Sequence, residues 1–261
     1  MNSSGIRHPR SAARARTGAL AAGALMSLAA LTGCAGSDSG DSAATDVSPS
    51  ESAAETSVAA SAVKPLTAAE LETAALVKAD LTGYEVATPD KAEITAADAV
   101  KVNGEECVPL GRAVAGTAVG QPAATAHRRV TGAPSEEAPL DINTGTVTLA
   151  SYASADEATA ALKSVADAVT ACAGGFQWTA GGEQMDASKV TKGTAPTAGE
   201  EAVAFTAVTP IDGIDAPWKV VVFRDGATLA HFTVANVAAM TSGEDFTFPA
   251  DLVTAQADKL A

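Results

Sequence analysis

The stretch Pro217-Trp-Lys-Val-Val-Val-Phe-Arg-Asp-Gly-Ala-Thr-Leu-Ala-His-Phe-Thr-Val-Ala-Asn236 is the strongest structural signal in the chain. Two apolar runs, 217–224 and 227–236, flank the pair Asp225-Gly226. An Asp-Gly pair between hydrophobic runs is typical of a β-hairpin with a primed turn. The side chains expected to fill this hairpin are Val220, Val222, Leu229, Phe232 and Val234. The stretch therefore predicts two antiparallel strands.

A long amphipathic helix is predicted from Ser154 to Cys172. Ser154 and Glu157 have the spacing of a capping box, and Gly174-Gly175 is a typical helix end. The apolar residues at helical spacing are Ala158, Ala161, Leu162, Val165, Val169 and Cys172. Cys172 should therefore lie on the buried face of the last turn.

Shorter elements are predicted on both sides of this helix. They are a helix started by a capping box at Thr67 and Glu70, an extended piece at 84–87, a helical turn opened by Glu105, strands at 124–130, 145–152, 176–179 and 202–208, and a helix at 249–260. The predicted elements follow the order of an α+β fold: a helix, strands, a long helix, several strands and a final helix. The predicted architecture is a single domain with an antiparallel sheet packed by helices.

The N-terminal region has the order of a bacterial lipoprotein leader. An arginine-containing segment and an apolar run from Ala19 to Leu31 precede Leu31-Thr-Gly-Cys34. The run is too short to span a membrane and suits a signal peptide, although an uncleaved anchor helix is the alternative. We expect residues 1–33 to be a signal peptide and Cys34 to be acylated. Residues 34–63, rich in Ser, Ala, Thr, Asp and Glu, should form a disordered tether, and residues 64–261 the folded domain.

The net charge of the chain argues against some classes of binding partner. The 261 residues carry a formal net charge of −14. Loss of the leader removes four arginines and no acidic residue, which leaves −18. So acidic a surface argues against nucleic acid, whose phosphates need Lys and Arg, and against a peripheral grip on anionic lipid head groups. The expected partner is the membrane, reached through the lipid on the extracytoplasmic face of the cell membrane.

Two cysteines remain after Cys34 is acylated, namely Cys107 and Cys172. Outside the membrane the environment is oxidising, so a structural disulfide between them is expected. The alternatives are two free buried thiols or a metal site. Two cysteines alone do not make a zinc site, and the histidines that follow the leader lie far away in sequence.

Catalytic motifs are missing from the sequence. It has no Gly-x-Ser-x-Gly, no His-Glu-x-x-His and no phosphate-binding Gly-x-x-x-x-Gly-Lys. His127 could act as a base, but an exposed strand position also explains it, and His231 reads as a histidine on a sheet face. We expect no catalytic residues, no bound metal and no cofactor, so the protein is predicted not to be an enzyme.

Three segments around the later cysteines carry a resemblance to a known family. They are Gly104-Glu-Glu-Cys-Val-Pro-Leu-Gly111, Thr146-Val-Thr-Leu-Ala-Ser-Tyr-Ala-Ser-Ala-Asp-Glu-Ala158, and Ala168-Val-Thr-Ala-Cys172 followed by Phe176-Gln-Trp178. Together they resemble the extracellular sensor domain of mycobacterial PknH-type receptor kinases and related actinobacterial lipoproteins. The resemblance implies an antiparallel sheet flanked by helices, a Cys107–Cys172 bridge and a ligand-binding cleft. That family has a second disulfide near its C-terminal hairpin, which this chain lacks, and no kinase domain is present here.

The function expected from these observations is binding or sensing without catalysis. A cleft between the sheet and the helix Ser154–Cys172 should take a small envelope molecule or a protein of the envelope. The candidate lining residues are Trp178 and Trp218, with Arg128 and Arg129 as polar contacts. Sheet packing or a solvated strand position is the alternative for all four.

Two other function classes stay open at this point. A carrier of lipids or other hydrophobic molecules would show a large apolar cavity. A hydrolase would need a Ser or Asp brought beside His127 or His231 in space.

Overall fold

The computed structural model describes residues 64–261, and the predictions for the leader 1–33, for Cys34 and for the tether 34–63 lie outside this range. The α-helices are α1 (Ala68–Ala74), α2 (Val108–Val114), α3 (Ala155–Ala171), α4 (Val237–Ser242) and α5 (Ala250–Leu260), and short 3-10 turns cover Lys78–Asp80 and Glu105–Cys107. Together with the strands described next, they confirm the α+β class predicted from the sequence.

A seven-stranded antiparallel sheet forms the centre of the molecule, in the order β1-β3-β4-β10-β9-β8-β7. Its strands are β1 (Tyr84–Ala87), β3 (Ala124–Gly132), β4 (Asn143–Ser151), β7 (Lys189–Lys192), β8 (Glu201–Ile211), β9 (Ile214–Asp225) and β10 (Thr228–Asn236). The predicted hairpin is β9 and β10, which occupy adjacent interior positions in this order.

The turn of this hairpin differs from the prediction by one residue. Asp225 pairs with Thr228, so the two central residues are Gly226 and Ala227. Gly226 has a φ of 52°, whereas Ala227 does not have a positive φ. Glycine in the first central position is the type II′ pattern, which fits the twist of the flanking strands as well as type I′ does.

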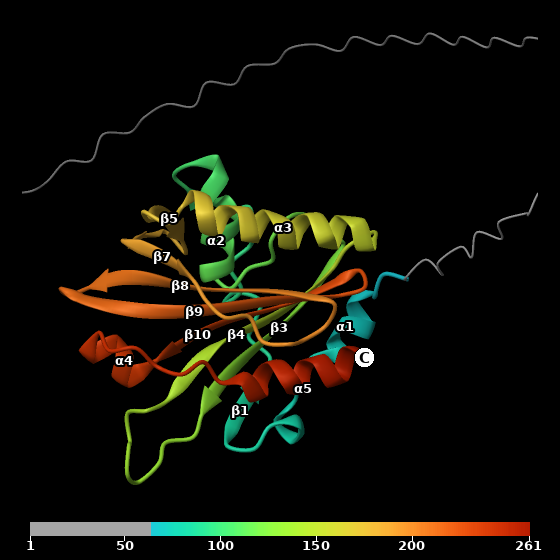
Figure 1. The fold of residues 1–261 in the computed structure, drawn as a ribbon. Coiled ribbons are helices and arrows are strands. Elements are labelled where there is room, and N and C mark those ends of the chain that lie inside the picture. Colours follow the sequence, from blue (N-terminus) through green and yellow to red (C-terminus); the bar gives the residue numbers. More distant parts are fainter. Residues whose placement is uncertain (1–63) are drawn as a thin grey trace, which may run out of the picture. The chain divides into compact units, whose positions relative to one another are not determined.

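Helices cover both faces of the large sheet, as Figure 1 shows. Side chains of β9 alternate between two cores. Val220 and Val222 belong to the core beneath α2 and α3, and Val221 and Phe223 belong to the core with α1 and α5. This period of two follows from the pleat of the strand, and it divides the apolar residues of the domain between two cores.

A second, three-stranded sheet lies next to α2. Its order is β2-β5-β6, with β2 (Lys101–Val102), β5 (Phe176–Ala180) and β6 (Glu183–Ala187). The backbone of α2 comes close to this sheet at Gly111, where a Cβ atom would lie 2.4 Å from the side chain of Val102.

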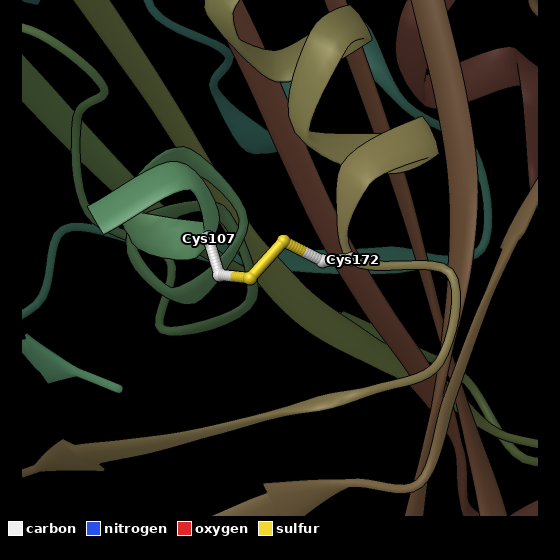
Figure 2. Close-up of a disulfide and its surroundings, with 2 residues drawn as sticks. All are labelled: Cys107 and Cys172. Atoms are coloured by element: carbon white, nitrogen blue, oxygen red, sulfur yellow. A yellow bond between two sulfur atoms is a disulfide. The ribbon is translucent and has the colours of Figure 1, made fainter. Parts of the chain in front are cut away.

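The bridge between Cys107 and Cys172 joins the start of α2 to the end of α3 (Figure 2). The Cα atoms are 5.9 Å apart, which suits a disulfide, and both cysteines are buried. Cys172 follows the last residue of α3 on the buried face, as the helical spacing predicted. The bridge thus holds together two helices that pack on the same face of the sheet.

Candidate functional site

The space between the large sheet and α3 is filled by core side chains. Leu162, Val165 and Val169 of α3 are buried and belong to the same core as Val220 and Val222 of the sheet. The cleft expected there is replaced by packing. A hollow suited to a small molecule lies on the same face of the sheet, beside the C-terminal end of α2.

This hollow is a groove of about 440 Å³. Three segments line it: residues 94–98, the end of α2 with the loop that follows (Arg112, residues 117–118 and residues 120–122), and Thr125 with His127 of β3. We call it the His127 groove. A smaller hollow of about 60 Å³ shares Ile94, Thr95 and His127 with it and extends toward Arg129 and Thr146. The volume of the larger hollow lies within the range of small-molecule sites, about 300–1,000 Å³.

Threonine hydroxyls of the sheet hold the end of α2 in place. Thr233 donates from Oγ1 to the carbonyl oxygen of Ala113 at 2.6 Å, and Thr148 donates from Oγ1 to the carbonyl oxygen of Gly116 at 2.8 Å. The last carbonyls of a helix have no partner within the helix, so such bonds satisfy them. One wall of the groove is therefore fixed against the sheet.

These donations also determine the tautomers of two histidines. Because the Thr148 hydroxyl already donates to Gly116, His127 must donate to it from Nδ1, over 3.0 Å. The Nε2 atom of His127 then accepts from the Thr125 hydroxyl at 3.2 Å. By the same argument, His231 donates from Nε2 to Thr233 Oγ1 at 3.0 Å.

Both histidines are uncharged at neutral pH. Burial lowers the pKa of His231 to about 4, and its side chain is closed off from solvent at 3 % exposure. Burial also lowers the pKa of His127, although the carboxylate of Glu72 opposes this and the charge of Arg128 adds to it. His127 is half-buried and lines the groove, so a bound molecule can contact it, unlike the buried His231.

Arg112 supplies the positive charge of the groove. It lies in the last turn of α2, and its Nη1 atom donates to the carbonyl oxygen of Gly120 at 2.9 Å. Its Nε atom is buried and lacks a hydrogen-bond partner, and within residues 64–261 no carboxylate lies within 4 Å of its guanidinium. The other arginines of the domain, Arg128, Arg129 and Arg224, each pair with a glutamate.

Two further hollows are less suited to a ligand. One of about 250 Å³, beside Phe205, Val221 and Phe248, is apolar but falls below the usual size range. The other, of about 500 Å³, lies against residues 244–249. Several of its polar groups already bond to protein groups: Asn236 donates to Asp141 and to Asn143, and Asp245 pairs with Lys219.

The two tryptophans predicted to line a cleft lie on different sheets. Trp178 is in β5 of the small sheet, stacks obliquely on Phe176 with centroids 5.4 Å apart, and is 3 % exposed. Trp218 is half-buried in β9 of the large sheet, between Ala207 and Ala235 in register. Both indole N–H groups are buried without a partner in the described domain. Neither residue lines the His127 groove.

The two arginines predicted as polar contacts point to opposite faces of β3. Arg128 is 5 % exposed and is held by α1, because its Nε donates to the carbonyl oxygen of Leu76 and its Nη2 to that of Glu72, both at 3.0 Å. Arg129 is exposed, pairs with Glu93 at 3.2 Å and borders the smaller hollow beside His127. Trp218 shares a face of the large sheet with Val220, Val222 and therefore His127, but it borders neither hollow beside His127, whereas Arg129 lies on that face and also borders the smaller one.

Sequence reasoning missed Arg112. It lies in the helical turn opened by Glu105, and no motif surrounds it. Within the described range, no three His, Cys, Asp or Glu side chains gather in the manner of a metal site. In the same range, no helix combines the length and the apolar character that crossing a membrane requires.

The chain matches no family model and no curated protein. Among solved structures it is similar to the crystal structure of the extracellular domain of PknH from Mycobacterium tuberculosis. The sequence identity is 13 %, the match covers 76 % of this chain and 97 % of that chain, and the TM-score is 0.48. At this level the similarity is a resemblance in fold only.

Proposed function

We propose that this protein is a lipid-anchored, extracytoplasmic binding or sensing protein whose domain takes a small envelope molecule into the His127 groove and does not turn it over. The leader ending at Cys34 supports the anchor and the compartment. The observation that carries the binding role is the groove itself. It has the volume of a small-molecule site, and two of its polar side chains are held in place: His127 donates to the Thr148 hydroxyl of the sheet, and Arg112 donates to the carbonyl oxygen of Gly120.

The lining of the groove fits recognition of a molecule with both apolar and polar parts. Ile94, Ala97 and Pro122 supply apolar surface, while Thr125 and Arg112 supply polar groups. Ligand sites in proteins have this composition, in which apolar walls provide most of the burial and a few placed polar groups orient the ligand. The apolar hollow beside Phe248 is smaller, so a lipid carrier is less well supported.

A hydrolase has one specific observation in its favour. The Thr125 hydroxyl donates to His127 Nε2, which is the arrangement of a hydroxyl nucleophile and its base. However, the third member that orients His127 is the neutral hydroxyl of Thr148 rather than a carboxylate. That hydroxyl cannot stabilise a charged imidazolium as a carboxylate does, so binding is the better-supported role.

The test is retention of envelope molecules by the full-length chain. The wild type and an Ala97→Trp variant are incubated with an extract of bacterial envelope small molecules, re-isolated and compared by mass spectrometry. Tryptophan at position 97 would fill the groove from its loop side without removing any of its polar groups. Ala160→Trp, at an exposed position of α3, is the matched control.

We expect one or more compounds to be retained by the wild type and by Ala160→Trp and lost in Ala97→Trp. Equal retention by all three chains, or no retention at all, would contradict a binding role for the groove. Steady turnover of esters, peptides or glycosides that disappears in both Thr125→Val and His127→Ala would show that the protein is a hydrolase instead.

A further inference from the structure

We infer that the molecule bound in the His127 groove is a small organic acid, held by its carboxylate at Arg112. This inference rests on the proposed function, which it makes specific. Its starting point is a half-buried guanidinium that lines the groove and has no carboxylate within 4 Å among residues 64–261.

The geometry of Arg112 leaves one end of the guanidinium for a ligand. Nη1 is engaged by the carbonyl oxygen of Gly120, and Nε is buried. Nη2 makes no hydrogen bond within the described domain and is not among its buried unpartnered atoms, so this amino group is accessible to a ligand in the groove that Arg112 lines. The bond to Gly120 orients the guanidinium before a ligand arrives, which reduces the entropy lost on binding.

The loop that carries Gly120 is itself held in place. Tyr152 donates from its hydroxyl to the carbonyl oxygen of Val119 at 2.6 Å, and Thr117 donates from its backbone N–H to the carbonyl oxygen of Arg112 at 3.0 Å. Gly120 has a φ of 67°, and a Cβ there would lie 3.3 Å from the side chain of Ala161. The guanidinium is thus fixed by a rigid loop rather than by a flexible one.

The charges around the groove select a ligand with a single negative charge. His127 is neutral, so Arg112 is the cation of the larger hollow, and Asp98 lies on its rim. The chain carries a formal net charge of −14, which repels a doubly charged phosphate more strongly than a carboxylate. The remaining Nη2 amino group can donate a charge-assisted hydrogen bond to one carboxylate oxygen. The apolar walls at Ile94, Ala97 and Pro122 then suit a short hydrocarbon body.

The experiment is calorimetric titration of the full-length chain at neutral pH with three acids, each paired with its own amide. Hexanoate and benzoate represent free organic acids, and N-acetyl-alanyl-alanine represents the carboxylate end of a peptide. A charge-assisted hydrogen bond favours the acid over the amide by about tenfold or more in Kd. We expect such a preference for at least one free acid, and a preference only for the dipeptide would contradict the assignment to a small organic acid.

Variants assign this preference to Arg112. Arg112→Gln should remove it, so that acid and amide bind within about twofold of each other, whereas Lys192→Gln, a control at an exposed cation of β7 away from the groove, should keep it. Asp98→Asn removes a negative charge from an exposed rim position and should tighten binding of the acid by about threefold. This variant keeps the test decisive even if Arg112→Gln does not fold.

Besides a preference only for the dipeptide, three results would overturn the inference: no acid binding below about 5 mM, equal binding of acid and amide, or an acid preference that survives in Arg112→Gln. If envelope compounds are lost in Ala97→Trp but no acid preference is seen, the inference fails while the proposed function stands.

Discussion

His127 and His231 lie in one row across the sheet, each in register with Thr148 of the strand between them. Both rings face the end of α2, and each makes a hydrogen bond to a threonine hydroxyl that donates to a carbonyl oxygen near that helix end. The neutral state of the buried ring is thus part of how the helix is fixed to the sheet. Stability should therefore depend on pH in the range where histidine titrates.

The pH dependence follows from the lowered pKa of His231. An unfolded histidine has a pKa near 6.5 and the native ring a pKa of about 4, so the unfolded chain takes up the proton first as the pH falls. The stability from the neutral ring is complete above pH 6.5 and is lost progressively toward pH 4, by about 3 kcal/mol in total. Urea unfolding of the wild type and of His231→Leu, measured from pH 7 to pH 4.5, checks this.

The variant should lose most of the slope between pH 6.5 and pH 4.5, even if it is less stable throughout. His127→Gln is the control and should keep it. Carboxylates such as Glu70, whose pKa falls to about 2 through its hydrogen bonds to Thr67, act at lower pH. A wild-type free energy of unfolding that stays flat across this window would refute the account of His231.

The disulfide should be a main source of stability. Cys107 and Cys172 are 65 residues apart, and the chain-entropy model gives about 4 kcal/mol for a loop of that size. Reduction should lower the melting temperature by roughly 10 °C, and a Cys107→Ser, Cys172→Ser double variant should match the reduced wild type. Detection of two free thiols by alkylation of the native, non-reduced protein would rule the bridge out.

Arg128 should be needed for stability rather than for ligand binding. Its buried guanidinium satisfies carbonyl oxygens of Glu72 and Leu76 at the end of α1 and pairs with the Glu72 carboxylate at 2.9 Å. Arg128→Met leaves those groups without their partner and should cost about 2–4 kcal/mol in chemical denaturation. Arg129→Met, which breaks the solvent-exposed pair with Glu93, should cost less than about 1 kcal/mol. Equal losses would contradict this division of roles.

The proposed membrane anchor is Cys34, which lies outside the described residues. If the sequence Leu31-Thr-Gly-Cys34 is a lipidation site, Cys34→Ser should move the protein from the detergent phase to the aqueous phase. Phase partitioning and the mass of the mature chain measure this. A variant that stays in the detergent phase at the wild-type mass would show that the lipoprotein interpretation is wrong.

The fold could be predicted from sequence wherever one element carried a local signal. The capping box at Thr67 and Glu70, the Ser154 cap of α3 and the hairpin β9–β10 are all present, and β1 has the predicted bounds. The segments that were missed are mostly polar. Strands β6 and β7 read Glu-Gln-Met-Asp-Ala and Lys-Val-Thr-Lys, and they form through pairing with β5 and β8 rather than through an alternating pattern.

The groove could not be predicted, because its residues come from three segments that meet only in the folded chain. Arg112 is bonded to the Gly120 carbonyl and lines the groove together with the segment 94–98. No sequence motif links Arg112 to either of them. The orientation of the two arginines could be predicted, since neighbouring residues of a strand point to opposite faces. That alternation alone separates Arg128, which faces α1, from Arg129, which shares a face with His127.

The most direct test of the central claim is to map the bound molecule on the domain by NMR. Isotope-labelled full-length chain is titrated with the compounds that it retains from the envelope extract, and backbone, histidine-ring and arginine side-chain signals are followed. We predict that the shifted signals belong to residues 94–98, Arg112, Thr125 and His127, and that those of residues 244–249 stay unchanged. Shifts confined to the hollow beside Phe248, or shifts spread evenly over the surface, would contradict the assignment of the His127 groove as the binding site.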